Sequence, residues 1–164
     1  MIIRKGLFHI KAIIKKKMYS LIYGKKILWG KNVTFRALFS LSIDGDGKVT
    51  IDDDCFFNNN CSINCLQSVS IGKGSIFGEN VKIYDHNHRF SDFSMPIKAQ
   101  GYSIGKVSIG DHCWIGSNVV ILKGSQIEDN CVIGAGCTIN GFVPQGTIVK
   151  CNNELVYEKI RQGD

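Results

Sequence analysis

A six-residue repeat of aliphatic residues constrains this sequence more than any other feature. Isoleucine occupies every sixth position from Ile109 to Ile139, and the interval recurs upstream in two other registers. Those registers are Ile71, Phe77 and Ile83, and then Ile51, Phe57, Ile63 and Val69. A period of six fits neither the 3.6-residue turn of an α-helix nor a strand that alternates every two residues. It fits a short strand followed by a corner, repeated three times in each turn of a triangular coil.

Other positions of the hexad agree with this interpretation. The residue after the aliphatic one is often glycine, and the residue four places after it is small or β-branched. Five of the seven cysteines occupy this second position: Cys55, Cys61, Cys113, Cys131 and Cys137. A small inward-facing side chain suits it, so we expect neither a disulfide nor a metal site. The sequence predicts an all-β fold, a parallel β-helix whose stacked coils form parallel sheets.

The basic residues gather near the start of the sequence. Residues 1–43 contain ten Lys and Arg residues and no acidic residue. Residues 44–164 contain ten Lys and Arg residues and fourteen Asp and Glu residues. Within residues 1–30, apolar residues recur at helical spacing: Ile3, Leu7, Ile10, Ile14, Met18 and Leu21. Two hypotheses stay open for this amphipathic helix. Residues 1–26 lie on an anionic membrane surface, or the stripe packs on its own domain and the lysines are solvated.

Cysteine usage and charge pattern also predict a location. Seven cysteines without a secretory signal predict the reducing cytoplasm, with peripheral contact at the inner face of the cytoplasmic membrane if residues 1–26 bind lipid. No apolar stretch is long enough for a membrane span. The basic residues near the start of the sequence form no recognised motif of interleaved basic and aromatic residues, so no nucleic-acid partner is expected.

The six-residue period fails between Ile83 and Ile109, and its register resumes shifted. The interruption predicts an extruded loop over residues 84–108, and loops on rigid scaffolds commonly carry function. Asp85-His86-Asn87-His88 lies at its root. The predicted organisation is a helical segment over 1–30, a β-helix over 31–150 and a helical tail over 151–164. The tail's apolar residues are Leu155, Val156 and Ile160.

Several motifs, in this order, resemble the hexapeptide-repeat acyltransferases. They are Ile109-Gly-Asp-His-Cys-Trp-Ile-Gly-Ser-Asn-Val-Val-Ile-Leu-Lys-Gly, then Ile133-Gly-Ala-Gly-Cys, then Val143-Pro144. The likeness spans roughly residues 50–150 and is nearest to the maltose and galactoside acetyltransferases and the bacterial polysaccharide O-acetyltransferases. The resemblance implies a left-handed β-helix, a homotrimer, and acetyl-CoA as co-substrate in a groove between neighbouring subunits.

The same resemblance implies a histidine general base, a role that suits a group titrating near neutral pH. His88 stands at the family's catalytic spacing from Ile83-Tyr84. His86 is the runner-up as base and is otherwise expected to bind the acceptor. Asn58 matches the family residue that contacts the acceptor, although a corner asparagine with left-handed backbone is the alternative. Asp85 either orients an imidazole, binds a sugar hydroxyl or forms a local turn.

Seven positions correspond to cofactor-binding positions of the family. They are Trp114, Gly116, Ser117, Ala135, Gly136, Asn140 and Lys150. Trp114 either walls the pantetheine channel or lies on an ordinary coil surface. The sequence departs from the family at the nucleotide end, where Leu155 and Glu158 replace expected basic residues and Asn140-Gly141 replaces Thr-Lys. Lys150, Lys159 and Arg161 are the candidate phosphate partners.

The predicted function is transfer of an acetyl group from acetyl-CoA to a sugar hydroxyl in surface polysaccharide biosynthesis. The acceptor is then a carbohydrate, lipid-linked or polymeric, attacked without a covalent enzyme intermediate. Two alternatives remain. One is N-acetylation of a nucleotide-linked amino sugar, and the other is a non-catalytic β-helix scaffold.

Overall fold

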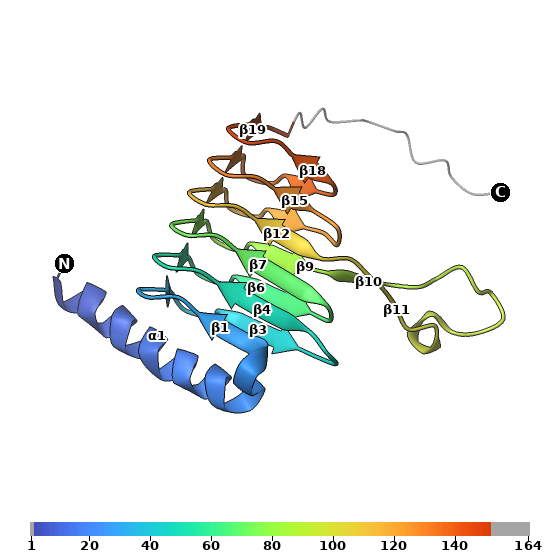
Figure 1. Ribbon diagram of the computed structural model, residues 1–164, viewed down its shortest axis with the longest axis horizontal. Coiled ribbons are helices and arrows are strands. Elements are labelled where there is room, and N and C mark those ends of the chain that lie inside the picture. Colours follow the sequence, from blue (N-terminus) through green and yellow to red (C-terminus); the bar gives the residue numbers. More distant parts are fainter. Residues whose placement is uncertain (1, 152–164) are drawn as a thin grey trace, which may run out of the picture.

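The computed structural model describes residues 2–151, with side chains described from residue 9 onward. An α-helix, α1 (Ile2–Tyr23), and a 3-10 turn, η1 (Gly24–Lys26), precede a stack of triangular coils that begins at β1 (Ile27–Trp29) (Figure 1). The β-helix thus begins before residue 31. The helical tail predicted over 151–164, with Leu155, Glu158, Lys159 and Arg161, lies outside the described residues from 152 onward.

Three parallel sheets form the faces of the prism. Sheet A contains β1, β4 (Lys48–Ile51), β7 (Ser68–Ile71), β12 (Val107–Ile109), β15 (Gln126–Ile127) and β18 (Phe142–Val143). Sheet B contains β2 (Thr34–Phe35), β5 (Phe56–Phe57), β8 (Ile76–Phe77), β13 (Trp114–Ile115), β16 (Val132–Ile133) and β19 (Ile148–Val149). Sheet C contains β3 (Ser40–Ile43), β6 (Ser62–Cys65), β9 (Lys82–Tyr84), β14 (Val120–Ile121) and β17 (Thr138–Ile139). We call the edges between faces the A/B, B/C and C/A corners.

The six-residue repeat maps onto this geometry directly. Ile109 pairs with Ile71 on one side and Ile127 on the other, so repeat positions stack into inward-facing columns. The third residue of many four-residue corners has a left-handed backbone, with φ of 61° at Asn60 and 59° at Asn118. Asparagine adopts this left-handed backbone conformation more readily than most residues do. The predicted parallel β-helix is confirmed.

The repeat cysteines point inward as predicted. Each of the five is buried, and their thiols cap backbone carbonyls of the adjacent coil. The Sγ of Cys55 lies 3.1 Å from the Gly72 oxygen, and that of Cys61 lies 3.1 Å from the Gly78 oxygen. Burial raises the pKa of the Cys55 thiol to about 11, so the group stays protonated and donates. These cysteines are structural parts of the corners.

Helix α1 covers the first coil with a face that the sequence did not predict. Ala12 and Tyr19 are buried, whereas Ile14 is 63% exposed and Leu21 is 87% exposed. The expectation that the apolar stripe packs on its own domain is therefore wrong for the stripe residues whose side chains are described. No helix within residues 2–151 is both long and apolar enough to cross a membrane.

The physical reason is that α1 covers a row of backbone carbonyls. The first coil has no coil beneath it to supply hydrogen-bond donors, and open backbone groups must find partners. The Tyr19 hydroxyl lies 3.3 Å from the Phe39 oxygen, and the Tyr23 hydroxyl donates to the Leu41 oxygen at 3.0 Å. The Lys15 ammonium also donates to the Phe39 oxygen. Side chains with polar ends therefore occupy the inner face.

The predicted loop is an arm that leaves the prism at the C/A corner (Figure 1). Its root is an antiparallel hairpin of β10 (His86–His88) and β11 (Tyr102–Ile104), and a 3-10 turn, η2 (Ile97–Ala99), precedes β11. Gln100 fastens the outer part, since its Nε2 donates to the Asp92 oxygen at 2.8 Å and its Oε1 accepts from the Asp92 amide at 3.1 Å.

Substituting Ile121 tests the core. The side chain is fully buried, so Ile121→Ala should lower the free energy of unfolding by about 2–5 kcal/mol. Leu28 is 59% exposed, and Leu28→Ala should change it by about 0.5 kcal/mol or less. Urea unfolding followed by circular dichroism measures both variants. Equal losses would contradict the assignment of Ile121 to the core.

Candidate functional site

The root of the arm is organised around one buried carboxylate. Asp85 is 0% exposed and accepts hydrogen bonds from the backbone amides of Leu66, Gln67 and Ser68 at 2.8, 2.7 and 2.8 Å. The Cys65 thiol lies 3.2 Å from its Oδ2. These amides belong to the C/A corner of the preceding coil, at the point where the arm replaces the next corner. The carboxylate thus accepts the hydrogen bonds that the replaced corner would have accepted.

The same carboxylate holds an imidazole. The Nδ1 of His86 lies 2.9 Å from Asp85 Oδ1. Burial raises the pKa of Asp85, but the Leu66 and Gln67 amides, His86 and Cys65 outweigh it and leave the pKa below its usual value. An ionised Asp85 fixes the tautomer in which Nδ1 carries the proton and donates to it. The Nε2 atom of His86 is then left as an acceptor.

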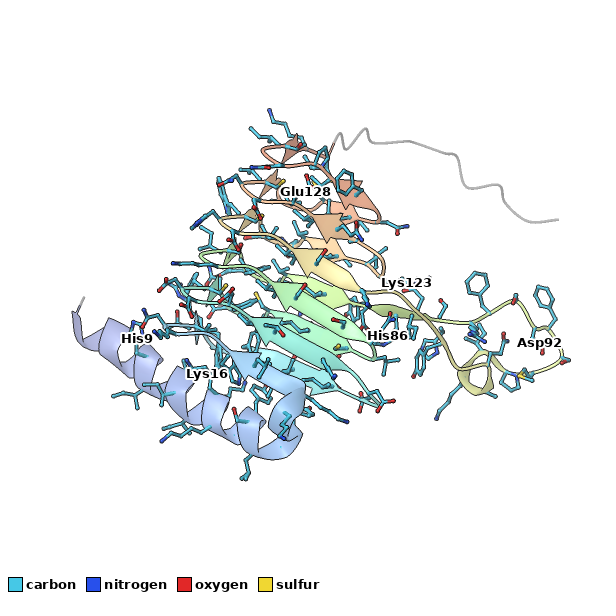
Figure 2. All side chains as sticks on the ribbon, viewed as in Figure 1. His9, Lys16, His86, Asp92, Lys123 and Glu128 are labelled. Atoms are coloured by element: carbon cyan, nitrogen blue, oxygen red, sulfur yellow. The ribbon has the colours of Figure 1, made fainter. Side chains whose placement is uncertain are left out.

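Both histidines lie on one face of the hairpin. His86 and His88 are two residues apart on β10, so their side chains share a face. Tyr102 pairs with His88 across the hairpin, and its ring centroid lies 4.6 Å from that of His88 and 5.1 Å from that of His86. His86 is partly buried at the root of the arm (Figure 2), and His88 is exposed. Asp85, His86, His88 and Tyr102 form what we call the histidine cluster.

The B/C corner holds most of the other predicted site residues. Asn58, Gly116 and Ser117 follow strands of sheet B, and Ala135 and Gly136 lie on the next coil. The amide of Asn58 donates to the Phe77 oxygen and that of Gly78 to the Ile115 oxygen, so Asn58 lies two coils from Gly116. At about 4.8 Å per coil this is roughly 10 Å. We call this set the B/C column.

The histidine cluster and the B/C column are not adjacent within one chain. Strand β9 of sheet C separates Asn80 at the B/C corner from Asp85 at the C/A corner. Five residues of extended chain span roughly 15 Å. The structure therefore does not bring Asn58 to His88 inside one molecule. Any site that uses both sets needs a second copy of the chain.

The remaining predicted residues are distributed over the same corners. Lys150 is exposed and follows β19, which places it at the top of the B/C column, whereas Asn140 follows β17 at the C/A corner. Asn58 is half-buried, and its Oδ1 accepts from the Asn59 amide at 2.9 Å, a local turn contact. The other two asparagines of the run connect coils. The Nδ2 of Asn59 donates to Glu79 at 3.0 Å, and the Nδ2 of Asn60 donates to Asn80 at 3.0 Å.

The two glycines of the column differ in what they require. A Cβ on Gly116 would lie 2.6 Å from the Ala135 amide nitrogen, so this glycine allows the coils to stack. Gly136 has a φ of 77°, and nothing lies within 4 Å of where its Cβ would be. Ala135 is exposed beside it. The surface next to Ser117 is thus open to a ligand chain, while Gly116 has a packing role.

Trp114 stands on an apolar strip along sheet B. It is 56% exposed and pairs with Ile76 and Val132 on the neighbouring coils. Ile76 is 44% exposed and Ile148, two coils further, is 62% exposed. In-register side chains on a sheet form one continuous surface. Both interpretations of Trp114, channel wall and ordinary coil surface, remain compatible with this position.

The bacterial transferase hexapeptide (six repeats) family matches residues 106–141, which span β12 to β17. The chain contains a hexapeptide-repeat domain. Galactoside O-acetyltransferase of Escherichia coli K12 is 32% identical over 126 residues, covering 77% of this chain and 50% of the relative. The relative named "Putative lipopolysaccharide biosynthesis O-acetyl transferase WbbJ" from the same strain is 29% identical over 130 residues, covering 75% and 66%. The chain thus spans between half and two thirds of these relatives.

Solved structures agree with the hexapeptide-repeat fold. The maltose O-acetyltransferase from Clostridium difficile 630 superposes with a TM-score of 0.63 at 28% identity, covering 82% of this chain and 72% of that one. A galactoside acetyltransferase in complex with coenzyme A superposes with a TM-score of 0.59 at 26% identity, covering 70% and 60%.

Sequence reasoning missed two parts of the cluster. Tyr102 carries no motif, and its place opposite His88 depends on the hairpin register. The three amides that bind Asp85 are backbone groups, which leave no trace in residue identity. One signal was available: Asp85 is the first residue after a repeat strand at the point where the period fails.

Substituting Asp85 tests its structural role through pH. Because its folded pKa is lowered, the stability it contributes is present above the unfolded value near pH 4 and is lost as pH falls through the folded pKa. Asp85→Asn should lower the unfolding free energy by about 2–4 kcal/mol at pH 7 and reduce the further loss in acid. Thermal melts from pH 7 to pH 3 measure this. Asp46→Asn, at an exposed position, is the control, and parallel curves for the two variants would contradict the role.

Proposed function

We propose that this protein is an acetyl-CoA-dependent O-acetyltransferase that acetylates a carbohydrate hydroxyl. The observation that carries the proposal is the histidine cluster, in which a buried carboxylate fixes one imidazole beside a second exposed one. Such a group supplies the proton acceptor that a hydroxyl nucleophile needs. Relatives named as a galactoside O-acetyltransferase and as a putative lipopolysaccharide biosynthesis O-acetyl transferase support this reaction class and a carbohydrate acceptor.

The cofactor site would lie along the B/C column. Acetyl-CoA supplies the activated thioester, and the open surface at Ser117, Ala135 and Gly136 would accept its pantetheine arm. Backbone amides at this corner are the donors available to the thioester oxygen. The exposed ammonium of Lys150 would pair with a phosphate. The coenzyme A complex of a galactoside acetyltransferase with this fold supports the assignment.

The site would be shared between copies of the chain. The B/C column and the histidine cluster lie at different corners, so a complete site forms where the B/C corner of one copy meets the C/A corner of another. Each contact is between two different surfaces, and such contacts produce a ring when they close. Three-fold closure suits a triangular prism, and we propose a homotrimer. The apolar strip at Trp114 would be covered in that assembly.

His88 is the proposed general base, and the Asp85–His86 pair would position the root of the arm. The family spacing favours His88, which is exposed to an incoming acceptor. The carboxylate partner favours His86, because it leaves Nε2 as the acceptor atom. The two assignments predict opposite mutant behaviour. The WbbJ relative and a colanic acid biosynthesis relative support an acceptor in surface polysaccharide assembly.

His88→Ala should lower kcat by a factor of roughly a hundred to ten thousand, because base catalysis typically contributes that much. Acetyl-CoA affinity should change little, since the proposed cofactor contacts are made by the B/C column and not by His88, and calorimetry measures it. His86→Ala should be much milder.

Two outcomes would change this assignment. Loss of turnover in His86→Ala with His88→Ala active would make His86 the base. Full activity in both, or no binding of acetyl-CoA, would contradict the proposed mechanism. Comparing a sugar with its amino-sugar analogue as acceptor separates O-acetylation from N-acetylation.

A further inference from the structure

The outer face of α1 is apolar and uncovered. Ile10, Ile14, Met18 and Leu21 are 57%, 63%, 43% and 87% exposed, and they follow one another at helical spacing. Ile13 and Ile22 beside them are 50% and 60% exposed. Exposed apolar patches of this kind on a protein surface mark sites of interaction. The opposite face already packs on the first coil, so this face is left for another partner.

The charges around the face indicate what that partner is. Lys11 and Lys17 are exposed on α1, and residues 1–43 contain ten basic residues and no acid. A second copy of the helix would bring lysines against lysines. A partner with an apolar interior and an anionic edge would match both the exposed apolar face of α1 and the lysines beside it. The interface of a bilayer that contains anionic phospholipid has this profile.

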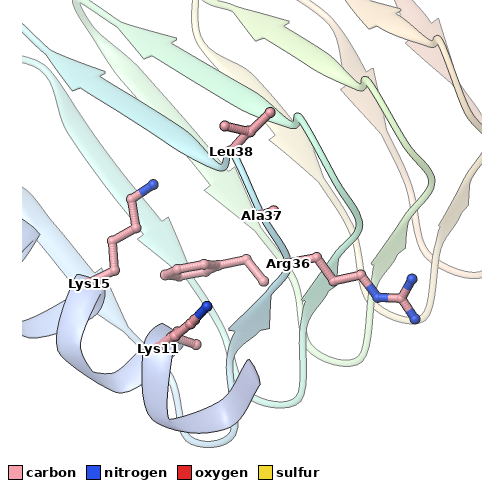
Figure 3. A pocket seen from close by; sticks show the side chains of 7 residues that line it. Lys11, Lys15, Arg36, Ala37 and Leu38 are labelled. Carbon is pink, nitrogen blue, oxygen red and sulfur yellow. The ribbon is translucent and has the colours of Figure 1, made fainter. Parts of the chain in front are cut away.

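A cavity beside the helix extends the same chemistry. It has a volume of about 160 Å³ and lies between α1 and the first B/C corner (Figure 3). Its lining is basic and apolar and contains no acidic residue. The lining residues are Lys11, Ala12, Lys15, Phe35, Arg36, Ala37 and Leu38. Burial lowers the pKa of Lys15, and a bound anion would oppose that shift. The cavity suits a phosphate joined to an apolar chain.

We infer that α1 lies in the interface of an anionic bilayer, with Ile10, Ile14 and Leu21 toward the acyl chains. Lys11, Lys15 and the cavity then lie at the level of the lipid phosphates. Lys17 reaches the same level by extending its stem, as interfacial lysines do. The first coil of the β-helix then lies closest to the bilayer. The inference does not depend on the proposed enzymatic activity.

Vesicle flotation of the full chain tests the inference. The vesicles are phosphatidylcholine alone or phosphatidylcholine mixed with phosphatidylglycerol. The protein should float with the mixed vesicles at low salt, and much of it should be released by high salt, which screens the lysines. Leu21→Gln should weaken the partition by about tenfold or more. Phe142→Gln, at a 61% exposed residue far from α1 along the stack, is the matched control and should bind unchanged.

The charge contribution is tested separately. Lys11→Gln should weaken binding to the mixed vesicles by about fivefold, as expected for one basic residue near an anionic surface. Lys48→Gln, at an exposed position of sheet A, is the control. Both pairs of variants should keep the melting temperature of the unsubstituted protein, because the substituted side chains are exposed.

Three results would overturn the inference. One is failure to bind the mixed vesicles. Another is binding that Leu21→Gln and Ile14→Gln leave unchanged, which would exclude insertion of the apolar face. The third is a smaller assembly for Leu21→Gln in sedimentation, which would mean that a second copy covers the face.

Discussion

Backbone hydrogen bonding between successive coils is the interaction on which the rest of this structure depends. Each coil donates amides to the carbonyls of the next, as Gly72 does to Ile109 and Gly116 does to Ile133. These bonds hold residues at the same repeat position directly above one another in successive coils. A period along the sequence therefore becomes a set of columns on the surface. The B/C column of candidate site residues follows from that constraint. The close approach at Gly116 is a further consequence.

Two places where this bonding is interrupted also suggest function. Below the first coil, carbonyls without a neighbouring coil bond to Tyr19, Tyr23 and Lys15 of α1, which turns the apolar side of the helix outward. At the arm, the corner amides of residues 66–68 bond to Asp85, which fixes His86. In both cases side chains make the hydrogen bonds that a coil, or a corner of a coil, would have made in that place.

The fold could be predicted from the sequence because period and register are properties of residue order. The strict interval from Ile109 to Ile139 leaves few other structures, and the failure after Ile83 locates the arm. The orientation of α1 could not be predicted, since a helical stripe identifies an apolar face and does not say what it meets. Ala12 and Tyr19 are buried because of the carbonyl row, which no pattern within the helix reveals. The division of the candidate site between two corners likewise depends on three-dimensional stacking.

We propose that one copy of the chain supplies the histidine cluster and another supplies the B/C column of each site. Mixed assemblies of two inactive variants test it most directly. His88→Ala removes the proposed base, and Ala135→Trp fills the exposed surface proposed for the cofactor. Co-assembly in equal amounts should restore activity to roughly a quarter of the sites, because some interfaces then pair an intact cluster with an intact column. Mixed assemblies that form but stay as inactive as either variant alone would contradict the claim.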